Sequence, residues 1–238
     1  MIYHEVSQGS TEWFRMRLGL ATASCFDKII TPKTAEPSKQ AGPYMAQLIG
    51  ELVTGETSEK FESYWMERGA MMEADASASY EAITGFTLAR GGFLTDDYMN
   101  IGASPDRRVL GPSGDVIGGV EIKCPSPAVH IENLLRVNGI DPSYNAQVQG
   151  QILIGGFEFV DWFSYHPDFP PAHIRTYRDD KFCEKLSVAL DEFVEMMQDK
   201  IEILKKMGVV IPEKPILSIY KKAMDFQNDN IPTFAAAG

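Results

Sequence analysis

The chain has 238 residues, of which 44% are hydrophobic and 23% are charged, so it can bury a full core as one domain. No apolar run approaches the length that a bilayer requires, which excludes a membrane-spanning protein. The net charge of −11 provides no overall basic footprint, so a nucleic-acid enzyme with this composition would have to gather its lysines and arginines on one surface.

The start of the chain and its cysteines indicate a reducing compartment. Residues 1–5 lack the basic and apolar regions of a signal peptide. Cys25, Cys124 and Cys183 are odd in number and widely spaced, which is typical of reduced thiols and of neither a zinc site nor an iron–sulfur cluster. We therefore expect a cytoplasmic protein with no membrane association.

The first two predicted helices, residues 11–18 and 23–30, are separated by Gly19. Ser24 lies in the first turn of the second helix, where free backbone N–H groups and the helix dipole favour an anion. Arg17, just before the break, could add a bidentate contact to the same anion. The pattern predicts a phosphate site. The alternative is that Arg17 stabilises the end of its own helix and Ser24 is an ordinary cap.

Two further helices are predicted at residues 43–53 and 64–84, after a proline-rich polar loop at 31–42. In the second of these helices Gly69 and Glu73 lie four residues apart and share a face. A glycine there would let the helix approach a sheet closely, so Glu73 could reach a site on that sheet. The alternative is a solvated helix residue.

The central part of the chain predicts strands at residues 86–94, 98–104 and 116–123, with a turn at 111–114 after the segment 107–110. A period of two places Glu121 and Lys123 on one face of the last strand and Ile122 on the other, toward the core. Asp106 follows the preceding strand, fifteen residues before Glu121, so the two carboxylates can converge.

Two carboxylates on adjacent strands are ligands that suit Mg²⁺, which takes its remaining ligands from water and substrate phosphate. A neighbouring lysine can orient the attacking water or offset charge that develops on phosphoryl oxygens. The alternative is a surface hairpin on which Glu121 and Lys123 form an ion pair that contributes little to stability.

Tyr144, Gln147 and Gln151 form one stripe of a helix predicted at residues 143–154, and their polar groups could bind phosphate or water. Strands at 159–166 and 173–178 follow, and then an amphipathic helix from an Asp179 cap to a Gly208 stop. The prediction is an α/β domain over residues 1–208. Residues 209–238 form an extension that is either an extended arm, anchored at 216–220 and Phe226, or disordered.

Five motifs of this chain resemble those of the bacteriophage lambda exonuclease and YqaJ-type viral recombinase nucleases, a family of the PD-(D/E)xK superfamily. They are Arg17-Leu-Gly-Leu-Ala-Thr-Ala-Ser24, Arg68-Gly-x-x-x-Glu73, Ser104-Pro-Asp106, Glu121-Ile-Lys-Cys-Pro125 and Tyr144-Asn-Ala-Gln147-Val-Gln149. The resemblance covers residues 9–202 approximately. It implies a restriction-endonuclease-like core, in which helices flank a central mixed sheet.

The resemblance also implies the roles of the site residues. Asp106, Glu121 and the backbone carbonyl of Ile122 would ligate metal, and Glu73 would support the site as a further candidate ligand. Lys123 would handle the nucleophile and Gln147 would assist it. Arg17, Ser24 and Ser104 would hold a 5′-phosphate. Two Mg²⁺ ions are expected for each active site, with Mn²⁺ as a substitute.

One departure from the family concerns the phosphate pocket. Lambda exonuclease has an arginine a few residues beyond its catalytic lysine that helps to bind the terminal phosphate, and residues 126–130 of this chain contain none. His130 is the candidate replacement. Without a replacement, the preference for a 5′-phosphorylated end should be weaker than in the relatives.

The function implied is a 5′→3′ exonuclease on linear double-stranded DNA that releases mononucleotides and leaves a 3′ strand for a single-strand annealing protein. The resemblance further implies a homotrimeric ring, whose lumen would carry the basic side chains. The alternatives are a structure-selective or restriction-type endonuclease with the same metal core, or a non-catalytic DNA-binding protein.

Overall fold

The computed structural model of the chain describes residues 1–57, 64–136, 139–217 and 219, with the backbone alone for 64–70. Its helical elements are α1 (Thr11–Arg17), the 3₁₀ helix η1 (Ala23–Lys28), α2 (Ala41–Thr54), α3 (Tyr64–Thr84), α4 (Pro127–Leu134), the 3₁₀ helix η2 (Pro142–Tyr144), α5 (Asn145–Gly155) and α6 (Asp180–Lys206). No helix in this part of the chain is long and apolar enough to cross a membrane.

The strands form two sheets. One has the order β1-β4-β5-β2 and the other β3-β6-β7-β8-β9. Their bounds are β1 (Ile2–His4), β2 (Ala21–Thr22), β3 (Thr87–Arg90), β4 (Phe93–Thr95), β5 (Ile101–Ala103), β6 (Arg107–Leu110), β7 (Val116–Lys123), β8 (Phe159–Ser164) and β9 (Ala172–Tyr177). Within each sheet one neighbouring pair is parallel, β2 with β5 and β7 with β8, and the other pairs are antiparallel. The mixed α/β class is thus confirmed.

The five-stranded sheet is the expected central mixed sheet. The strand predicted at residues 86–94 is divided between this sheet and the four-stranded one, because two glycines interrupt it. Gly92 has a φ of +69°, which turns the chain, and a Cβ on Gly91 would lie 1.7 Å from the carbonyl oxygen of Pro105. The interruption places β3 and β4 in different sheets. It also brings the chain at Gly91 against the residue that precedes Asp106.

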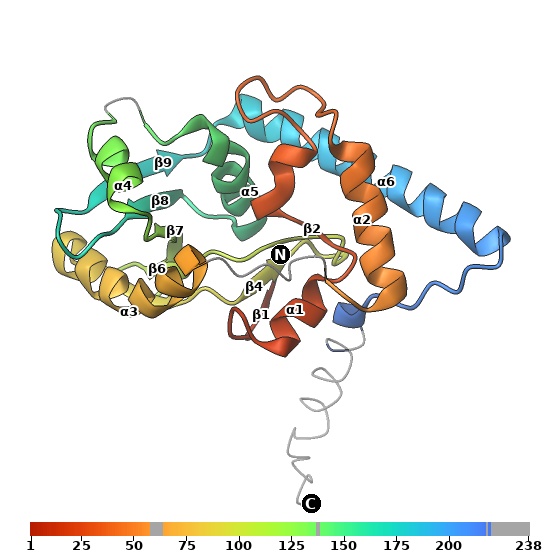
Figure 1. Cartoon of the computed structure of the whole chain (residues 1–238), viewed down its shortest axis with the longest axis horizontal. Coiled ribbons are helices and arrows are strands. Elements are labelled where there is room, and N and C mark those ends of the chain that lie inside the picture. Colours follow the sequence, from red (N-terminus) through yellow and green to blue (C-terminus); the bar gives the residue numbers. More distant parts are fainter. Residues whose placement is uncertain (58–63, 137–138, 218, 220–238) are drawn as a thin grey trace, which may run out of the picture.

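Helices cover both faces of the five-stranded sheet (Figure 1). α3 packs on one face, where Ala76 and Tyr80 join a cluster with Val109, Val120 and Ile122. α5 covers the other face and packs in turn against α6 and η1. This second cluster is the larger one, and it is built mainly from η1, α2, α5 and α6.

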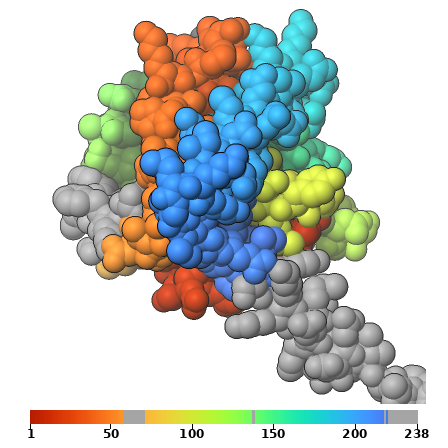
Figure 2. Space-filling model, turned by 90° about the vertical axis from the view of Figure 1, so that its right-hand side faces the viewer, coloured from red at the N-terminus to blue at the C-terminus, as the bar shows by residue number. Residues whose placement is uncertain are grey.

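The long helix α6 begins and ends where the sequence predicts. The side chain of Asp179 accepts a hydrogen bond from the Phe182 N–H at 3.1 Å, and Gly208 has a φ of +89° after the last turn. Its buried stripe runs from Phe182 to Ile201. In Figure 2 the blue surface of α6 lies beside the orange surface of α2. Buried residues of both helices belong to one apolar cluster.

The segment after α6 returns to the N-terminal part of the fold. Ile216 is fully buried and packs in a cluster with Trp13 and Met16 of α1 and with Phe93 and Met99. Nearby, the Lys214 ammonium donates to Asn100 Oδ1 at 3.0 Å. Part of the predicted extension therefore packs on the domain, while the proposed anchors Tyr220 and Phe226 lie outside the described residues.

A buried ionic network joins α3 to the sheet. Asp161 of β8 is fully buried and accepts two hydrogen bonds from Arg175, at 2.9 and 2.8 Å, and one from the Tyr80 hydroxyl at 2.6 Å. His173 Nε2 lies 3.0 Å from the same carboxylate. Burial alone would raise the pKa of Asp161, but the hydrogen bonds outweigh it and lower this pKa to about 2.

The network predicts how stability depends on pH. Because the folded-state pKa of Asp161 lies below the ordinary value of 3.8, its ionised form stabilises the fold above about pH 4, and this stabilisation is lost as the pH falls toward 2. Asp161→Asn should lower the free energy of unfolding at pH 7 by about 3 kcal/mol, because it leaves the buried face of Arg175 without its counter-ion.

Denaturant unfolding at several pH values measures both effects. The unfolding free energy of Asp161→Asn should also change less between about pH 4 and pH 2 than that of the wild type. Asp199→Asn, an exposed change on α6, is the matched control and should follow the wild type. Parallel pH profiles for wild type and Asp161→Asn would contradict this account.

Candidate active site

Glu121 is the centre of a buried polar cluster on the face of β7 that α5 covers. Its side chain is 4% exposed, and Oε1 accepts hydrogen bonds from Lys123 Nζ at 2.6 Å and from Gln147 Nε2 at 2.7 Å. Oε2 accepts from Gln151 Nε2 at 2.6 Å. The predicted stripe of α5 thus meets the predicted face of β7, and the structure brings Glu121, Lys123 and Gln147 together.

Asp106 lies beside this cluster, in the link between β5 and β6. Its Oδ2 accepts from the Ile122 N–H at 2.6 Å and its Oδ1 from Gln8 Nε2 at 3.2 Å. Burial and the neighbouring Glu121 carboxylate raise the pKa of Asp106 to about 8. The side chain of Ile122 points to the opposite face and packs in the core, as its position in β7 predicts.

Lys123 is held as a cation between these carboxylates. Burial would lower its pKa, but the charges of Glu121 and Asp106 outweigh burial and raise it. The ammonium also lies 5.3 Å from the ring centroid of Tyr144, at the end of η2. Lys123 can therefore offset negative charge or orient a water molecule, but it is a poor proton acceptor in this arrangement.

The donor set of this cluster suits a hard divalent cation. Two carboxylates, Asp106 and Glu121, lie close enough that the charge of Glu121 disfavours the ionised form of Asp106. The carbonyl of Ile122 belongs to the residue whose N–H donates to Asp106. Gln151 Oε1 is buried and has no hydrogen-bond partner within the described part of the chain. Among the side chains described, no three from His, Cys, Asp or Glu are grouped to hold an ion by themselves.

Glu73 reaches this region from α3 through an arginine. Its Oε1 accepts a hydrogen bond from Arg107 Nη1, and the same nitrogen donates to the backbone carbonyl of Asp106 at 2.8 Å. Glu73 also raises the pKa of Asp106, with a smaller effect than burial or Glu121. The expected approach of Glu73 to the carboxylate pair therefore occurs, with a guanidinium bound to Glu73.

The residues predicted to bind a terminal phosphate are joined by the pairing of β2 with β5. These strands are parallel, with Thr22 opposite Gly102, so Ser24 and Ser104 follow their ends at the same edge. Trp13 Nε1 donates to Ser104 Oγ at 3.0 Å, and the Arg17 guanidinium lies 4.2 Å from the Trp13 ring centroid.

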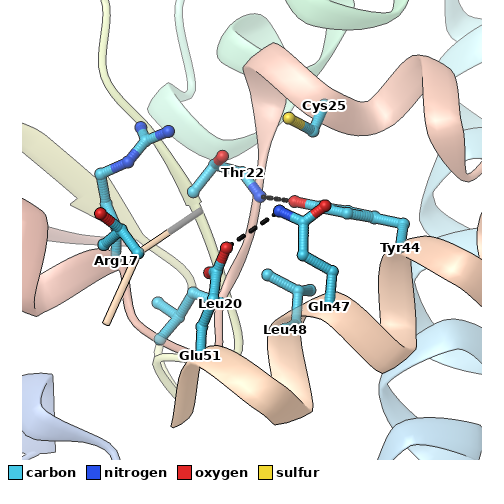
Figure 3. Close-up of a pocket in the computed structure, with 9 residues that line it drawn as sticks. Arg17, Leu20, Thr22, Cys25, Tyr44, Gln47, Leu48 and Glu51 are labelled. Carbon is cyan, nitrogen blue, oxygen red and sulfur yellow. Dashed lines mark hydrogen bonds between the residues drawn. The ribbon is translucent and has the colours of Figure 1, made fainter. Parts of the chain in front are cut away.

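Arg17 lines a pocket that is shown in Figure 3. The other lining residues include Thr22 and Cys25 on one chain segment and Tyr44, Gln47 and Glu51 of α2 on the other. The Tyr44 hydroxyl accepts a hydrogen bond from the Thr22 N–H at 3.4 Å, which ties α2 to the start of η1. The pocket thus combines a guanidinium with polar groups near the first turn of η1.

Ser24 and Ser104 differ in how available their hydroxyl groups are. Ser24 is exposed in the first turn of η1, which is a 3₁₀ helix rather than the expected α-helix, and its Oγ lies 3.3 Å from Thr22 Oγ1. Ser104 Oγ donates its proton to the carbonyl of Gly92 at 2.7 Å. Ser24 can therefore donate to an anion as it stands, whereas Ser104 would have to leave Gly92.

The candidate role of His130 in binding phosphate is wrong. His130 is fully buried in α4, with Nδ1 2.8 Å from Ser164 Oγ and Nε2 3.0 Å from the carbonyl oxygen of Pro170. Burial lowers its pKa, so this imidazole stays neutral. It is a core histidine whose two ring nitrogens are engaged within the fold, and it does not replace the missing arginine.

Sequence reasoning missed three residues that contact the site: Gln8, Trp13 and Arg107. Gln8 precedes Gly9 and the Ser10 cap of α1, so its position in a loop before a capped helix was the available signal. No pattern in the sequence singles out Trp13, which is also a core residue. Arg107 immediately follows Asp106, and its direction could be derived from the period of β6.

Comparisons with known proteins agree with this geometry. A family model described as YqaJ-like viral recombinase domain matches residues 12–158. The crystal structure of an alkaline exonuclease (LHK-Exo) from Laribacter hongkongensis is 31% identical, with a TM-score of 0.73, over 84% of this chain and 98% of that one. The structure of LHK-Exo in complex with dAMP matches with the same values.

A phage-related exonuclease from Haemophilus somnus 129PT is 15% identical, with a TM-score of 0.58 over 78% of this chain and 96% of that chain, and supports the fold alone. A search among curated proteins finds no match.

The close contact of α5 with η1 generates a prediction for the whole site. A Cβ on Gly150 would lie 2.5 Å from the ring of the fully buried Phe26, so Gly150→Ala should push α5 away from η1. The expected cost is about 1–3 kcal/mol in the free energy of unfolding, together with a loss of nuclease activity, because α5 carries Gln147 and Gln151.

Gly50→Ala is the matched control. It also replaces a helix glycine, but a Cβ at Gly50 meets nothing within 4 Å, so this variant should be neutral or slightly stabilising. Thermal unfolding and DNA degradation assays on both variants test the prediction, and a Gly150→Ala protein as stable and active as Gly50→Ala would refute it.

Proposed function

The chain belongs to the family of YqaJ-like viral recombinase domains, and from this premise we propose that it is a Mg²⁺-dependent 5′→3′ exonuclease of linear double-stranded DNA. Its family membership supports a DNA exonuclease role. In the proposed reaction the enzyme releases mononucleotides and leaves a 3′ single strand for an annealing protein.

The observation that carries the proposal is the convergence of the half-buried Asp106 and Lys123 on the buried Glu121. Two adjacent carboxylates favour a bound cation here, because burial and the charge of Glu121 disfavour the ionised form of Asp106 and a cation would offset both effects. Asp106, Glu121 and the Ile122 carbonyl would hold Mg²⁺, or Mn²⁺ in its place. When bound, the ion would supply an activated water molecule and stabilise charge on the phosphate.

The surrounding side chains have separate tasks in this proposal. Gln147 and Gln151 fix both oxygens of Glu121, which orients the carboxylate without adding charge. Lys123 stays protonated and offsets negative charge as it develops on the phosphoryl oxygens. These neutral and positive donors would hold the two carboxylates in place between turnovers.

The proposed 5′→3′ polarity depends on the residues predicted to bind a terminal phosphate. Arg17 and Ser24 would hold the 5′-phosphate, near the link through Ser104 that leads to Asp106. A phosphate bound there would place the first phosphodiester bond next to the metal ligands, so cleavage would start at a 5′ end.

We further propose a homotrimeric ring that acts on DNA ends in the cytoplasm, with an annealing protein as a partner. The net charge of −11 is compatible with this arrangement if basic side chains face the DNA and acidic ones face outward. Such a separation would disfavour non-specific DNA binding on the outside.

The first prediction concerns the metal ligands. Asp106→Ala and Glu121→Ala should each reduce Mg²⁺-dependent degradation by about 10³-fold or more, because each removes a metal ligand. DNA binding should be largely retained, since phosphate contacts elsewhere hold the duplex. Gel assays with linear and closed circular DNA measure activity and distinguish an exonuclease, which spares circles, from an endonuclease. Full activity in either variant would refute the assignment.

The second prediction concerns Lys123. Lys123→Ala should lower kcat by about 10²–10³-fold with little change in KM, because the ammonium acts on charge that appears in the transition state. Lys200→Ala, an exposed change on α6, is the control and should leave both constants unchanged. A higher KM with an unchanged kcat for Lys123→Ala would make the lysine a binding residue instead.

The third prediction concerns polarity and the end pocket. Linear duplexes should lose a 5′ label first, and a 5′-hydroxyl end should start more slowly than a 5′-phosphate end. Arg17→Ala should remove most of that difference, whereas Arg15→Ala, an exposed arginine of the same helix, should keep it. Because His130 is buried and neutral, the phosphate preference should not grow as the pH falls from about 8 to 6.

Label released first from the 3′ end would overturn the polarity. Equal rates for the two 5′ ends in the wild type would remove the phosphate pocket.

A further inference from the structure

Arg107 lies on the face of β6 that α3 covers. Alternation along the strand places Arg107 and Val109 on one side, and Val109 packs with Ala76 and Tyr80 of α3. Glu73 precedes Ala76 by one helical turn and Tyr80 by two, so it projects from the same side of α3. The ion pair between Glu73 and Arg107 is therefore fixed by the packing of a helix on a strand.

Arg108 points the opposite way. Its guanidinium lies 3.8 Å from the ring centroid of Tyr3, and its Nε donates to the carbonyl of Arg90 at 2.8 Å. Two consecutive arginines thus have different surroundings, and only Arg107 contacts the acidic site.

The guanidinium of Arg107 binds two oxygen atoms of the site at once. One nitrogen donates to the Glu73 carboxylate and to the Asp106 carbonyl, and the two side chains are 26% and 28% exposed. Glu121, in contrast, faces α5 on the other side of the sheet, where Lys123, Gln147 and Gln151 bind it. Asp106 lies near both Glu73 and Glu121. Arg107 donates to Glu73, whereas Lys123 and two glutamines donate to Glu121.

We propose that Arg107 takes the place of a second divalent ion: it neutralises Glu73, fixes the backbone at Asp106 and leaves a centre for one ion at Asp106, Glu121 and the Ile122 carbonyl. This inference rests on the proposed function and departs from the two ions that the family resemblance implies. A divalent ion at Glu73 would have to displace a guanidinium that remains charged at every pH at which the protein folds. Arg107 is accordingly a positioning residue that sets metal stoichiometry.

The test is calorimetric titration of metal-free, full-length protein with Mn²⁺ alone. Wild type should bind one ion. Glu73→Gln should also bind one ion with an affinity within about threefold of wild type, because Glu73 is not a ligand. Arg107→Ala should gain a second, weaker site, since it leaves Glu73 and Asp106 without the guanidinium. Arg108→Ala, the matched control, should behave as wild type.

Two sites in the wild type, or loss of a site in Glu73→Gln, would overturn the proposal, and so would a single site in folded Arg107→Ala. If circular dichroism shows that Arg107→Ala is unfolded, the wild type and Glu73→Gln decide. Asp106→Ala separates the two levels of inference, because it should lose the single site. If the wild type degrades DNA with Mg²⁺ but binds two Mn²⁺ ions, only the role of Arg107 is refuted. If the wild type neither binds Mn²⁺ nor degrades DNA, the proposed function is refuted as well.

Discussion

The arrangement of this molecule depends on two neighbouring carboxylates, of which Glu121 is buried and Asp106 is half-buried. Burial and the charge of Glu121 both disfavour the ionised form of Asp106, and the fold surrounds the pair with hydrogen-bond donors. Glu121 receives an ammonium and two amides, and Asp106 receives a backbone N–H and the amide of Gln8. All of these donors are neutral except the Lys123 ammonium, so one positive charge faces two carboxylates. A bound cation would supply the remaining positive charge.

Glycines allow the backbone segments that carry these groups to approach. At Gly91 the chain touches the carbonyl of Pro105, so β3 and β4 separate into two sheets at the level of Asp106. At Gly150 the helix α5 rests on the ring of Phe26 while its other side reaches Glu121. The candidate site therefore lies where the two sheets separate and where α5 contacts both β7 and η1. A larger side chain at Gly91 or Gly150 would push the neighbouring segments apart, because neither position has free space for a Cβ.

The parts of the fold that the sequence predicted well are those with a strong period or a specific stop. β7 has an alternating pattern that ends at Pro125, and α6 has an Asp179 cap and a Gly208 stop. β1 and β2 have three and two residues, which is too short for a pattern to be visible. The sequence analysis did not predict α4, because this helix buries polar residues and exposes apolar ones. His130 and Asn133 are buried, while Val129 and Ile131 are exposed. The burial of His130 depends on tertiary packing, so its neutral state could not be predicted from the neighbouring residues. The face of β6 on which Arg107 lies could be predicted, because it depends only on alternation along the strand.

The residues proposed for end recognition and those proposed for metal binding share one support in this fold. The segment from Gln8 to Arg17 contacts Asp106 through its first residue and Ser104 through Trp13, while its last residue stacks on Trp13. Trp13 packs in one cluster with Ile216, which lies in the segment that follows α6. A displacement of this segment would therefore move the proposed terminal-phosphate groups and the proposed metal ligand Asp106 together. The proposed reaction cleaves a bond at a fixed distance from the bound end, so a shared rigid support would keep these two sites in register.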